Sequence, residues 1–201
     1  MLKKLSMISV CAASAFALNT AELNINDSDL EVMAKFDMGQ FNDSVEPETV
    51  FVGVRLLNGH KSHSDDEDNS LDGFLEANFL MQREIGNKGI TIGLGVKLNA
   101  TQNKIKDKSV DFMSIPLGVE AGYRIPASDL IPMYVGASLY YAPSVLSLGD
   151  ADNFLEYRIN YDIEVIKNGR ITLGYRSINT NYESDNFNYN KSLYGGFKFA
   201  F

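Results

Sequence analysis

The segment spanning residues 154–177 constrains the fold more than any other part of the chain. Over residues 155–165, apolar and polar residues alternate without a break, which is the two-residue period of a β-strand with one apolar face. After a turn at residues 167–169, the alternation resumes over residues 170–176. The first arm is long enough to cross a membrane as a tilted strand, which needs roughly 9 to 11 residues.

The turn of this hairpin also predicts its register. Apolar residues must face apolar residues across the pair, and this holds only for an odd loop length. We therefore expect a three-residue loop at 167–169, with its glycine supplying the positive φ of a bulge. In that register two diagonal ion pairs form, namely Glu164–Arg170 and Asp162–Arg176.

Residues 1–17 are predicted to be a secretory signal peptide. Lys3 and Lys4 precede an apolar run over residues 5–16 that is too short to span a bilayer as a helix. Cleavage after Ala17 would leave residues 18–201 as one barrel domain. Cys11, the only cysteine, lies in the removed segment, so the mature chain is expected to hold no disulfide and no cysteine-based metal site.

The charge of the chain bears on its partners and its location. Without Lys3 and Lys4, 16 basic residues remain against 26 acidic ones, a formal charge of -10, which argues against a nucleic-acid partner. After the signal segment, no apolar run approaches the ~20 residues of a transmembrane helix. An exported chain of this kind is either soluble in the periplasm or built into the outer membrane as strands.

Alternation recurs along the rest of the chain. Nine segments are clear, and a tenth at residues 21–26 is weaker. Because single-chain bacterial barrels have an even number of strands with both termini in the periplasm, we predict ten strands, with eight as the alternative. Pro116 cannot donate to a ladder, so we expect a bulge there or a slightly different placement of this strand. The long connections near 58–70, 100–109, 142–152 and 179–190 are predicted to be loops on the outer side.

Two features favour a membrane barrel over a soluble one. The polar face carries glycines, which weaken a strand unless a neighbour crowds them, and long charged side chains in a narrow lumen could do so: Gly93, Gly95, Gly118, Gly122, Gly136, Gly174 and Gly196. Tyrosines on the apolar face near strand ends are typical of an interfacial girdle: Tyr123, Tyr141, Tyr157 and Tyr175. The predicted fold class is therefore all-β, a small transmembrane antiparallel up-and-down β-barrel.

The inward positions are predicted to carry seven acidic and eight basic side chains. Such a lumen can pair its charges internally, whereas an ion buried without a partner would cost several kcal/mol. The predicted ion network comprises Lys97, Glu120, Glu156, Arg158, Asp162, Glu164, Arg170 and Arg176. Two interpretations remain open, a salt-bridged plug and a narrow path for ions or small solutes.

The loop at residues 58–70 holds the only two histidines. His60, His63, Asp65 and Asp66 are weak candidates for a metal site, and His60 and His63 could support a hydrolytic one. The loop has no H-E-x-x-H motif and no calcium-loop spacing. We therefore expect a solvated polar loop and no cofactor, with metal binding, adhesion and surface hydrolysis as alternatives.

Other stretches predict contacts in the cell envelope. Lys104, Lys106 and Lys108 could touch lipopolysaccharide phosphates, although ordinary surface charge explains them as well. The chain ends in a strand with aromatic residues at every second position, Phe197, Phe199 and Phe201. This ending resembles the signal that the barrel assembly machinery recognises during insertion. We expect a monomer.

Four stretches together resemble the YfaZ family of bacterial outer-membrane proteins: His63-Ser64-Asp65-Asp66, Tyr140-Tyr141-Ala142-Pro143 followed by Leu146-Ser147, Gly174-Tyr175-Arg176, and the terminal aromatic strand. The resemblance implies a small outer-membrane barrel with no established activity and no catalytic residues. The expected function is a structural or small-solute channel protein of the outer membrane, not an enzyme. The alternative is a surface hydrolase, similar to a lipid A deacylase or a protease.

Overall fold

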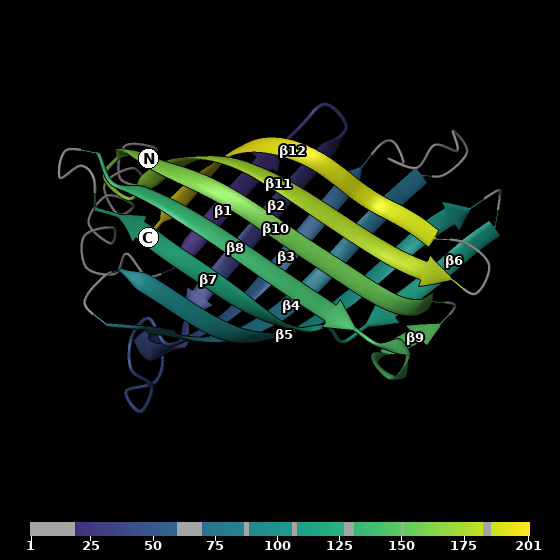
Figure 1. Ribbon diagram of the computed structural model, residues 1–201, viewed down its shortest axis with the longest axis horizontal. Helices are drawn as coiled ribbons and strands as arrows, with labels where there is room; N and C mark the ends of the chain where they lie inside the picture. The colour runs from purple at the N-terminus through teal and green to yellow at the C-terminus, as the bar shows by residue number, and fades with distance from the viewer. Residues whose placement is uncertain are drawn as a thin grey trace, which may run out of the picture.

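The structure, a computed structural model, describes residues 19–59, 70–86, 89–105, 108–126, 131–149, 151–182 and 186–201. These residues form twelve strands and two 3₁₀ turns (Figure 1). The elements are β1 (Thr20–Ile25), β2 (Asp29–Asp37), η2 (Met38–Gln40), β3 (Val50–Gly59), β4 (Ser70–Glu84), β5 (Ile90–Ile105), β6 (Lys108–Ser114), β7 (Leu117–Ile125), β8 (Met133–Ala142), η3 (Ser144–Leu146), β9 (Ser147–Gly149), β10 (Ala151–Ile166), β11 (Gly169–Tyr182) and β12 (Asn186–Ala200).

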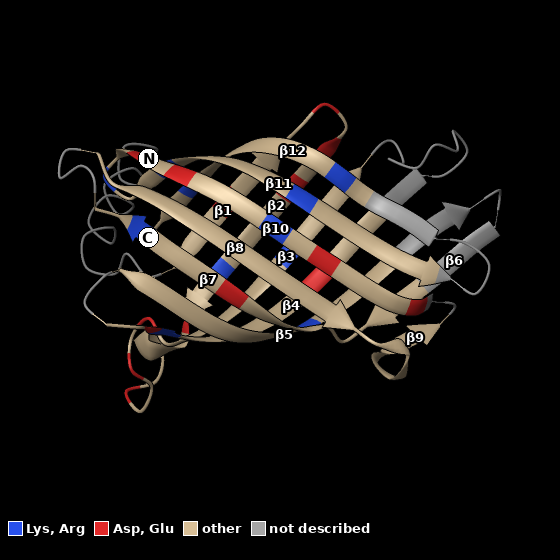
Figure 2. Cartoon of the chain, viewed as in Figure 1, with Lys and Arg blue, Asp and Glu red and all other residues tan. Residues whose placement is uncertain are grey.

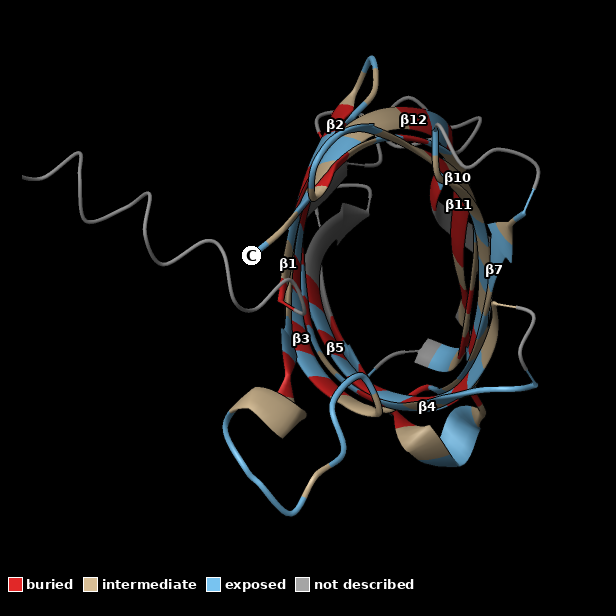
Figure 3. Ribbon diagram, turned by 90° about the vertical axis from the view of Figure 1, so that its left-hand side faces the viewer, coloured by how far each residue is buried: buried red, intermediate tan, exposed pale blue. Residues whose placement is uncertain are grey.

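The strands close into one antiparallel barrel. Most strands pair with their neighbours in the chain, and β1 pairs with β12 to complete the ring (Figures 1 and 3). β6 and β7 pair in turn with the same strand, β5, and β9 continues the line of β8 beside β6. The twelve elements thus make a ten-strand barrel, which confirms the predicted strand number and fold class.

The weak N-terminal segment is the strand that closes the barrel. Ala21 lies opposite Phe199 on one side and opposite Ala34 on the other. Both chain ends therefore lie at the same end of the barrel (Figure 1), and Asn19 and Phe201 exchange backbone hydrogen bonds of 3.2 and 2.9 Å. The β10–β11 turn lies at the same end, since the Ala200 N–H donates to the Asn168 carbonyl at 2.8 Å.

The interruption between β6 and β7 lies at Ile115 and Pro116. Pro116 has no N–H to donate, but its carbonyl accepts from the Lys97 N–H at 2.9 Å, and the Ile115 N–H donates to the Leu146 carbonyl at 2.9 Å. Leu146 lies in η3, next to a second proline, Pro143. The irregularity expected at Pro116 is present, and it is matched by one in the neighbouring strand.

The predicted register of the β10–β11 hairpin is wrong by two residues. The residue with positive φ is Asn168, at 65°, and Gly169 is already paired with Ile166. A bulge between Glu164 and Ile166 supplies the extra residue, so a two-residue turn also keeps apolar residues opposite one another. Glu164 consequently lies directly opposite Arg170 rather than diagonal to it.

Several predicted outer loops are largely strand. β5 extends to Ile105, β11 extends to Tyr182, and β12 begins at Asn186. These extensions lack the strict apolar alternation of the barrel body. Beyond the apolar band, backbone pairing continues without an apolar face to bury, because strand pairing satisfies the backbone whichever side chains it carries. The sequence pattern therefore marks the apolar band and underestimates the strand lengths.

The outer face of the barrel is apolar and exposed. Its side chains include Leu23, Val54, Phe79, Leu94, Val119, Leu139, Ile159, Leu173 and Phe197. Figure 2 shows that charged residues recur along the strands of the barrel body, and Figure 3 shows buried positions around the ring. An apolar outside with a polar inside is the arrangement of a transmembrane barrel. Separately, no helix within the described ranges is long and apolar enough to cross a membrane.

Inward glycines make room for neighbouring side chains. A Cβ at Gly118 would collide with Tyr140, and one at Gly174 would collide with Tyr194; each glycine lies directly opposite that tyrosine in the neighbouring strand. The prediction that something crowds these glycines is therefore right. The prediction that charged side chains do so is wrong, because aromatic and amide groups fill the space.

Candidate functional site

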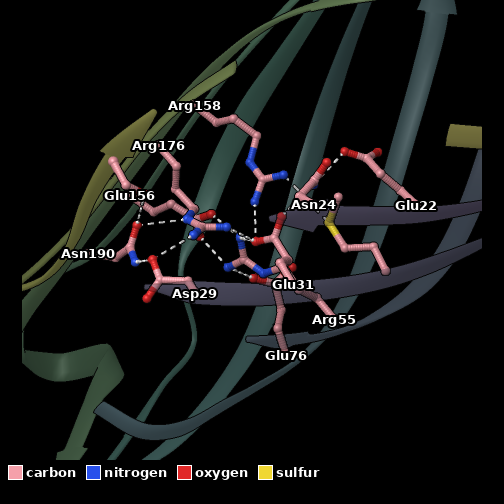
Figure 4. Close-up of polar contacts among 12 residues, drawn as sticks. Glu22, Asn24, Asp29, Glu31, Arg55, Glu76, Glu156, Arg158, Arg176 and Asn190 are labelled. Atoms are coloured by element: carbon pink, nitrogen blue, oxygen red, sulfur yellow. Dashed lines mark hydrogen bonds and ion pairs between the residues drawn. The ribbon is translucent and has the colours of Figure 1, made fainter. Parts of the chain in front are cut away.

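A network of eight ionised side chains crosses the lumen and is called here the charge layer (Figure 4). Four are acidic and four are basic: Asp29, Glu31, Glu76, Glu156, Arg55, Lys97, Arg158 and Arg176. They come from β2, β3, β4, β5, β10 and β11. Most were expected to point inward from the alternation, but Asp29 was not counted among them.

Arg55 lies at the centre of the charge layer. Its Nη1 and Nη2 donate to the two carboxylate oxygens of Glu156 at 2.5 and 2.9 Å, a bidentate pair. Arg55 also contacts Glu76, and its Nη1 lies 3.6 Å from the Glu31 Oε2. Since β3 and β10 lie on opposite sides of the ten-strand ring, the Arg55–Glu156 pair spans the lumen.

Glu31 forms ion pairs with arginine side chains from the opposite wall of the barrel. Its Oε2 accepts from Arg158 at 2.7 Å and from Arg176 at 2.5 Å, and its Oε1 accepts from the Asn24 amide at 2.8 Å. Arg176 also donates through Nε to Asn190 Oδ1 at 3.0 Å. The Glu31 carboxylate thus accepts hydrogen bonds from residues of three strands, β1, β10 and β11.

Lys97, a member of the charge layer, also contacts Tyr140, which in turn binds Glu120. Its Nζ donates to Glu156 at 2.9 Å, lies 3.3 Å from Glu76 and sits 3.9 Å from the centre of the Tyr140 ring. The Tyr140 hydroxyl donates to Glu120 Oε1 at 2.6 Å. Charges this deeply buried are stable only when each has partners, and the four-to-four balance provides them.

A second layer, apolar and inside the barrel, lies directly beyond the charge layer and is called here the apolar lid. It consists of Leu57, Phe74, Phe112, Ala142, Phe154 and Ile178, with Leu146 packed against them. Phe154 is fully buried, and its ring stacks 6.3 Å from Phe74 and 5.8 Å from Phe112 between centroids. The Arg55 guanidinium lies 4.9 Å from the Phe74 ring centre, so the two layers touch.

On the other side of the charge layer the lumen is open. A cavity of about 560 Å³, called here the vestibule, extends toward the barrel end that holds both termini. Its wall includes Lys35, Glu120, Tyr134, Arg158 and Lys198. The ion pairs around it are more exposed than those in the charge layer. Among the described residues, packed side chains therefore fill the lumen at the charge layer and the apolar lid, whereas the vestibule is hollow.

The sequence as a whole matches one protein family. The family model, described as "YfaZ precursor", matches residues 2–201. The chain belongs to the YfaZ family. This confirms the resemblance carried by the four sequence stretches.

This YfaZ family member was also compared with curated proteins and with solved structures. No curated protein matches the sequence. Among solved structures, a chain titled "KdgM porin" is similar with a TM-score of 0.45 and 6% sequence identity, over 91% of this chain and 98% of the porin chain. The assignment to the YfaZ family therefore rests on the family match alone.

The eight residues of the predicted ion network fall into two groups in the structure. Four belong to the charge layer, namely Lys97, Glu156, Arg158 and Arg176. The other four lie at or near the vestibule, namely Glu120, Asp162, Glu164 and Arg170. Six further charged residues outside the predicted network are also buried: Glu22, Asp29, Glu31, Asp37, Arg55 and Glu76. The eight residues therefore do not form one contiguous network of direct ion pairs.

Of the two ion pairs predicted in the hairpin, one is present. Arg170 Nε lies 3.7 Å from Glu164 Oε2. The prediction of an Asp162–Arg176 pair is wrong, because the register places Asp162 opposite Thr172. Asp162 instead accepts from Lys198 at 2.8 Å, and the partners of Arg176 lie on β2 and β12.

Sequence reasoning missed the apolar lid. Four of its residues lie two positions from a charge-layer residue on the same strand face, as Leu57 follows Arg55 and Phe154 precedes Glu156. Extending the alternation past the end of each apolar run would have placed these side chains inside. The signal was present, but we had expected every inward position to be polar.

The remaining candidate residues lie elsewhere. Phe197, Phe199 and Phe201 are on the outer face of the barrel end, each about two-fifths exposed, where their predicted part in assembly stays a prediction. His60, His63, Asp65 and Asp66 lie outside the described residues, as does the predicted signal peptide. In the part of the chain that is described, no group of three or more metal-ligating side chains converges.

Proposed function

We propose that this YfaZ family member is a structural barrel of the outer membrane whose lumen passes no solute in the conformation seen here. The observation that carries the proposal is the stack of two closed layers. In the charge layer, Arg55 reaches the opposite wall with about 1% of its side chain exposed. In the apolar lid, Phe154 is fully buried against two other rings. A solute would have to displace both layers.

The proposal includes an orientation. Bacterial barrels have short connections on the periplasmic side, so we place the end that holds both termini there. The vestibule then faces the periplasm, and the apolar lid lies toward the cell surface. A narrow channel is the second candidate, and the vestibule supports it because half of the lumen is already hollow.

Planar-bilayer recording tests the proposal. Purified, heat-modifiable protein is expected to give no single-channel current at either polarity. The variant Arg55→Ala/Glu156→Ala/Phe154→Ala removes the span across the lumen and the central ring of the lid, without changing the net charge of the charge layer. It is expected to conduct. A matched control, Phe36→Ala/Phe79→Ala, removes two outward-facing rings and should stay silent.

Current through the unmodified protein would overturn the structural role and favour the narrow channel. If the triple variant folds but remains silent, the two layers are not what closes the lumen.

The predictions about partners stay predictions. They concern lipopolysaccharide contact by Lys104, Lys106 and Lys108, insertion by the barrel assembly machinery, and a monomeric state. The hydrolase and metal-loop alternatives rest on His60 and His63. Replacing both with alanine tests each, through loss of any lipid or peptide hydrolysis and through loss of zinc or nickel binding.

A further inference from the structure

The vestibule has the dimensions of a ligand site. Its volume of about 560 Å³ lies within the roughly 300–1,000 Å³ typical of small-molecule pockets. It is open at the end with both termini and blind at the charge layer. Tyr134 and Tyr194 line it together with charged and amide side chains. Such a cavity can hold a small polar solute without letting it cross the barrel.

One ion pair spans the vestibule and is held loosely. Lys35 on β2 and Glu120 on β7 approach at 3.5 Å, and their side chains are 34% and 28% exposed. By contrast, the pairs that Arg55 makes with Glu156 are 2.5 and 2.9 Å long and buried. A long, partly exposed ion pair contributes little to stability, so a ligand can replace it at low cost.

A second cation at the blind end has a weak partner. Arg158 donates through Nη2 to Glu31, but its Nη1 donates to the sulfur of Met33 at 3.7 Å. A thioether is a weak acceptor, and a ligand carboxylate would be a stronger one. Met33 precedes Lys35 by two residues, so both side chains lie on the inner face of β2. A ligand carboxylate in the vestibule can therefore pair with either of two cations, Lys35 on β2 and Arg158 on β10.

The anionic side of the vestibule is fixed more firmly. Glu120 accepts from the Tyr140 hydroxyl at 2.6 Å through Oε1, while its Oε2 faces Lys35. Tyr140 is itself held over Gly118 and against Lys97. The Oε2 atom is thus a positioned acceptor for a ligand ammonium group.

The charge balance restricts the kind of ligand. A singly charged anion or cation that broke the Lys35–Glu120 pair would leave the other partner as an unpaired ion in a confined space, which is costly. A molecule with both charges can pair with both partners at once. We propose that the vestibule binds small soluble zwitterions, with the ligand ammonium on Glu120 and the ligand carboxylate on Lys35 and Arg158.

This inference is independent of whether the lumen conducts, because binding requires only that the vestibule be open at one end. A sealed barrel and a narrow channel would both retain the site. The test is therefore a binding measurement on the folded, full-length barrel in detergent micelles, with folding checked by heat-modifiability.

The probes are 4-aminobutyrate as the zwitterion, and acetate and methylammonium as singly charged controls, measured by ligand-observed NMR. The unmodified protein should bind 4-aminobutyrate at least about tenfold more tightly than either control, a difference of about 1.4 kcal/mol. The double variant Lys35→Met/Glu120→Gln should lose that preference. The matched variant Arg83→Gln/Glu46→Gln removes an exposed ion pair that does not line the vestibule and should keep 4-aminobutyrate affinity within about twofold.

The single variants reverse the selectivity and are the sharpest test. Glu120→Gln leaves Lys35 unpaired, so acetate should bind more tightly than to the unmodified protein. Lys35→Met leaves Glu120 unpaired, so methylammonium should gain instead. The proposal fails if 4-aminobutyrate does not bind, if acetate binds equally well to the unmodified barrel, or if neither single variant shifts selectivity in the stated direction.

Discussion

The two halves of the lumen are built from the same kinds of strand, yet one is filled and the other is hollow. In the filled half, Arg55 and Glu156 meet across the ring, and the stacked rings around Phe154 lie beyond them. In the hollow half, the ion pair across the lumen is the longer and more exposed Lys35–Glu120 pair. The filled half is therefore closed by long side chains that reach one another from opposite walls and by the aromatic rings that pack beside them.

The difference shows that charge alone does not seal a narrow barrel. Both halves carry balanced ion pairs, but inward glycines line part of the vestibule wall, at Gly122 and Gly136. A glycine presents no side chain to the lumen and lets a neighbour fold back against the wall, as Asn160 does over Gly136. Where glycines occupy inward positions, the centre of the lumen stays free.

The largest expected effect is at Arg55. Arg55→Met removes a buried cation that contacts three carboxylates, and the unpaired charges should cost on the order of 3–5 kcal/mol or prevent folding. Urea unfolding followed by heat-modifiability measures the loss. Arg83→Met is the control, because Arg83 is 81% exposed. Equal stability of the two variants would contradict a structural charge layer.

Phe154→Ala should be the next most damaging change. It empties the centre of the apolar lid and should cost about 3 kcal/mol through lost burial and the cavity left behind. Phe79→Ala, on the outer face, should cost much less in a lipid bilayer, because lipid fills the space. If both changes lower the unfolding midpoint equally, the inner aromatic rings are not a packed core.

A smaller difference in stability is expected between two glycine substitutions in neighbouring strands. Gly174 lies opposite Tyr194, and Gly195 lies opposite Leu173. A Cβ at Gly174 would meet the Tyr194 ring, whereas one at Gly195 meets nothing within 4 Å. Gly174→Ala should therefore cost about 1–3 kcal/mol, and Gly195→Ala should be close to neutral. In a double-mutant cycle with Tyr194→Ala, the cost of Gly174→Ala should largely disappear.

The smallest effect is expected for the pair that spans the vestibule. Lys35→Met/Glu120→Gln removes both charges together and should change the unfolding free energy by no more than about 1 kcal/mol, since the pair is partly exposed and long. Chemical denaturation in the same detergent measures it. A loss as large as that of Arg55→Met would show that the two halves of the lumen are equally tight.

The sequence by itself determined the strands of the barrel body, the face that each of their residues takes and, through the even strand number of such barrels, the number ten. These follow from local geometry, because successive side chains of a strand point to opposite faces and an alternating run must bury one face. The weak segment at residues 21–26 was found only because the strand number had to be even, and it is indeed β1.

Only the tertiary structure decided which inward residues meet. Arg55 and Glu156 lie 101 residues apart, and their contact depends on the register of every hairpin between them. A bulge such as the one between Glu164 and Ile166 shifts that register by a residue that no alternation pattern reveals. Alternation determines whether a side chain points into the lumen or outward. The accumulated stagger of the strands around the closed barrel determines the position of that side chain along the barrel axis. The partners across the lumen therefore could not be predicted from the sequence.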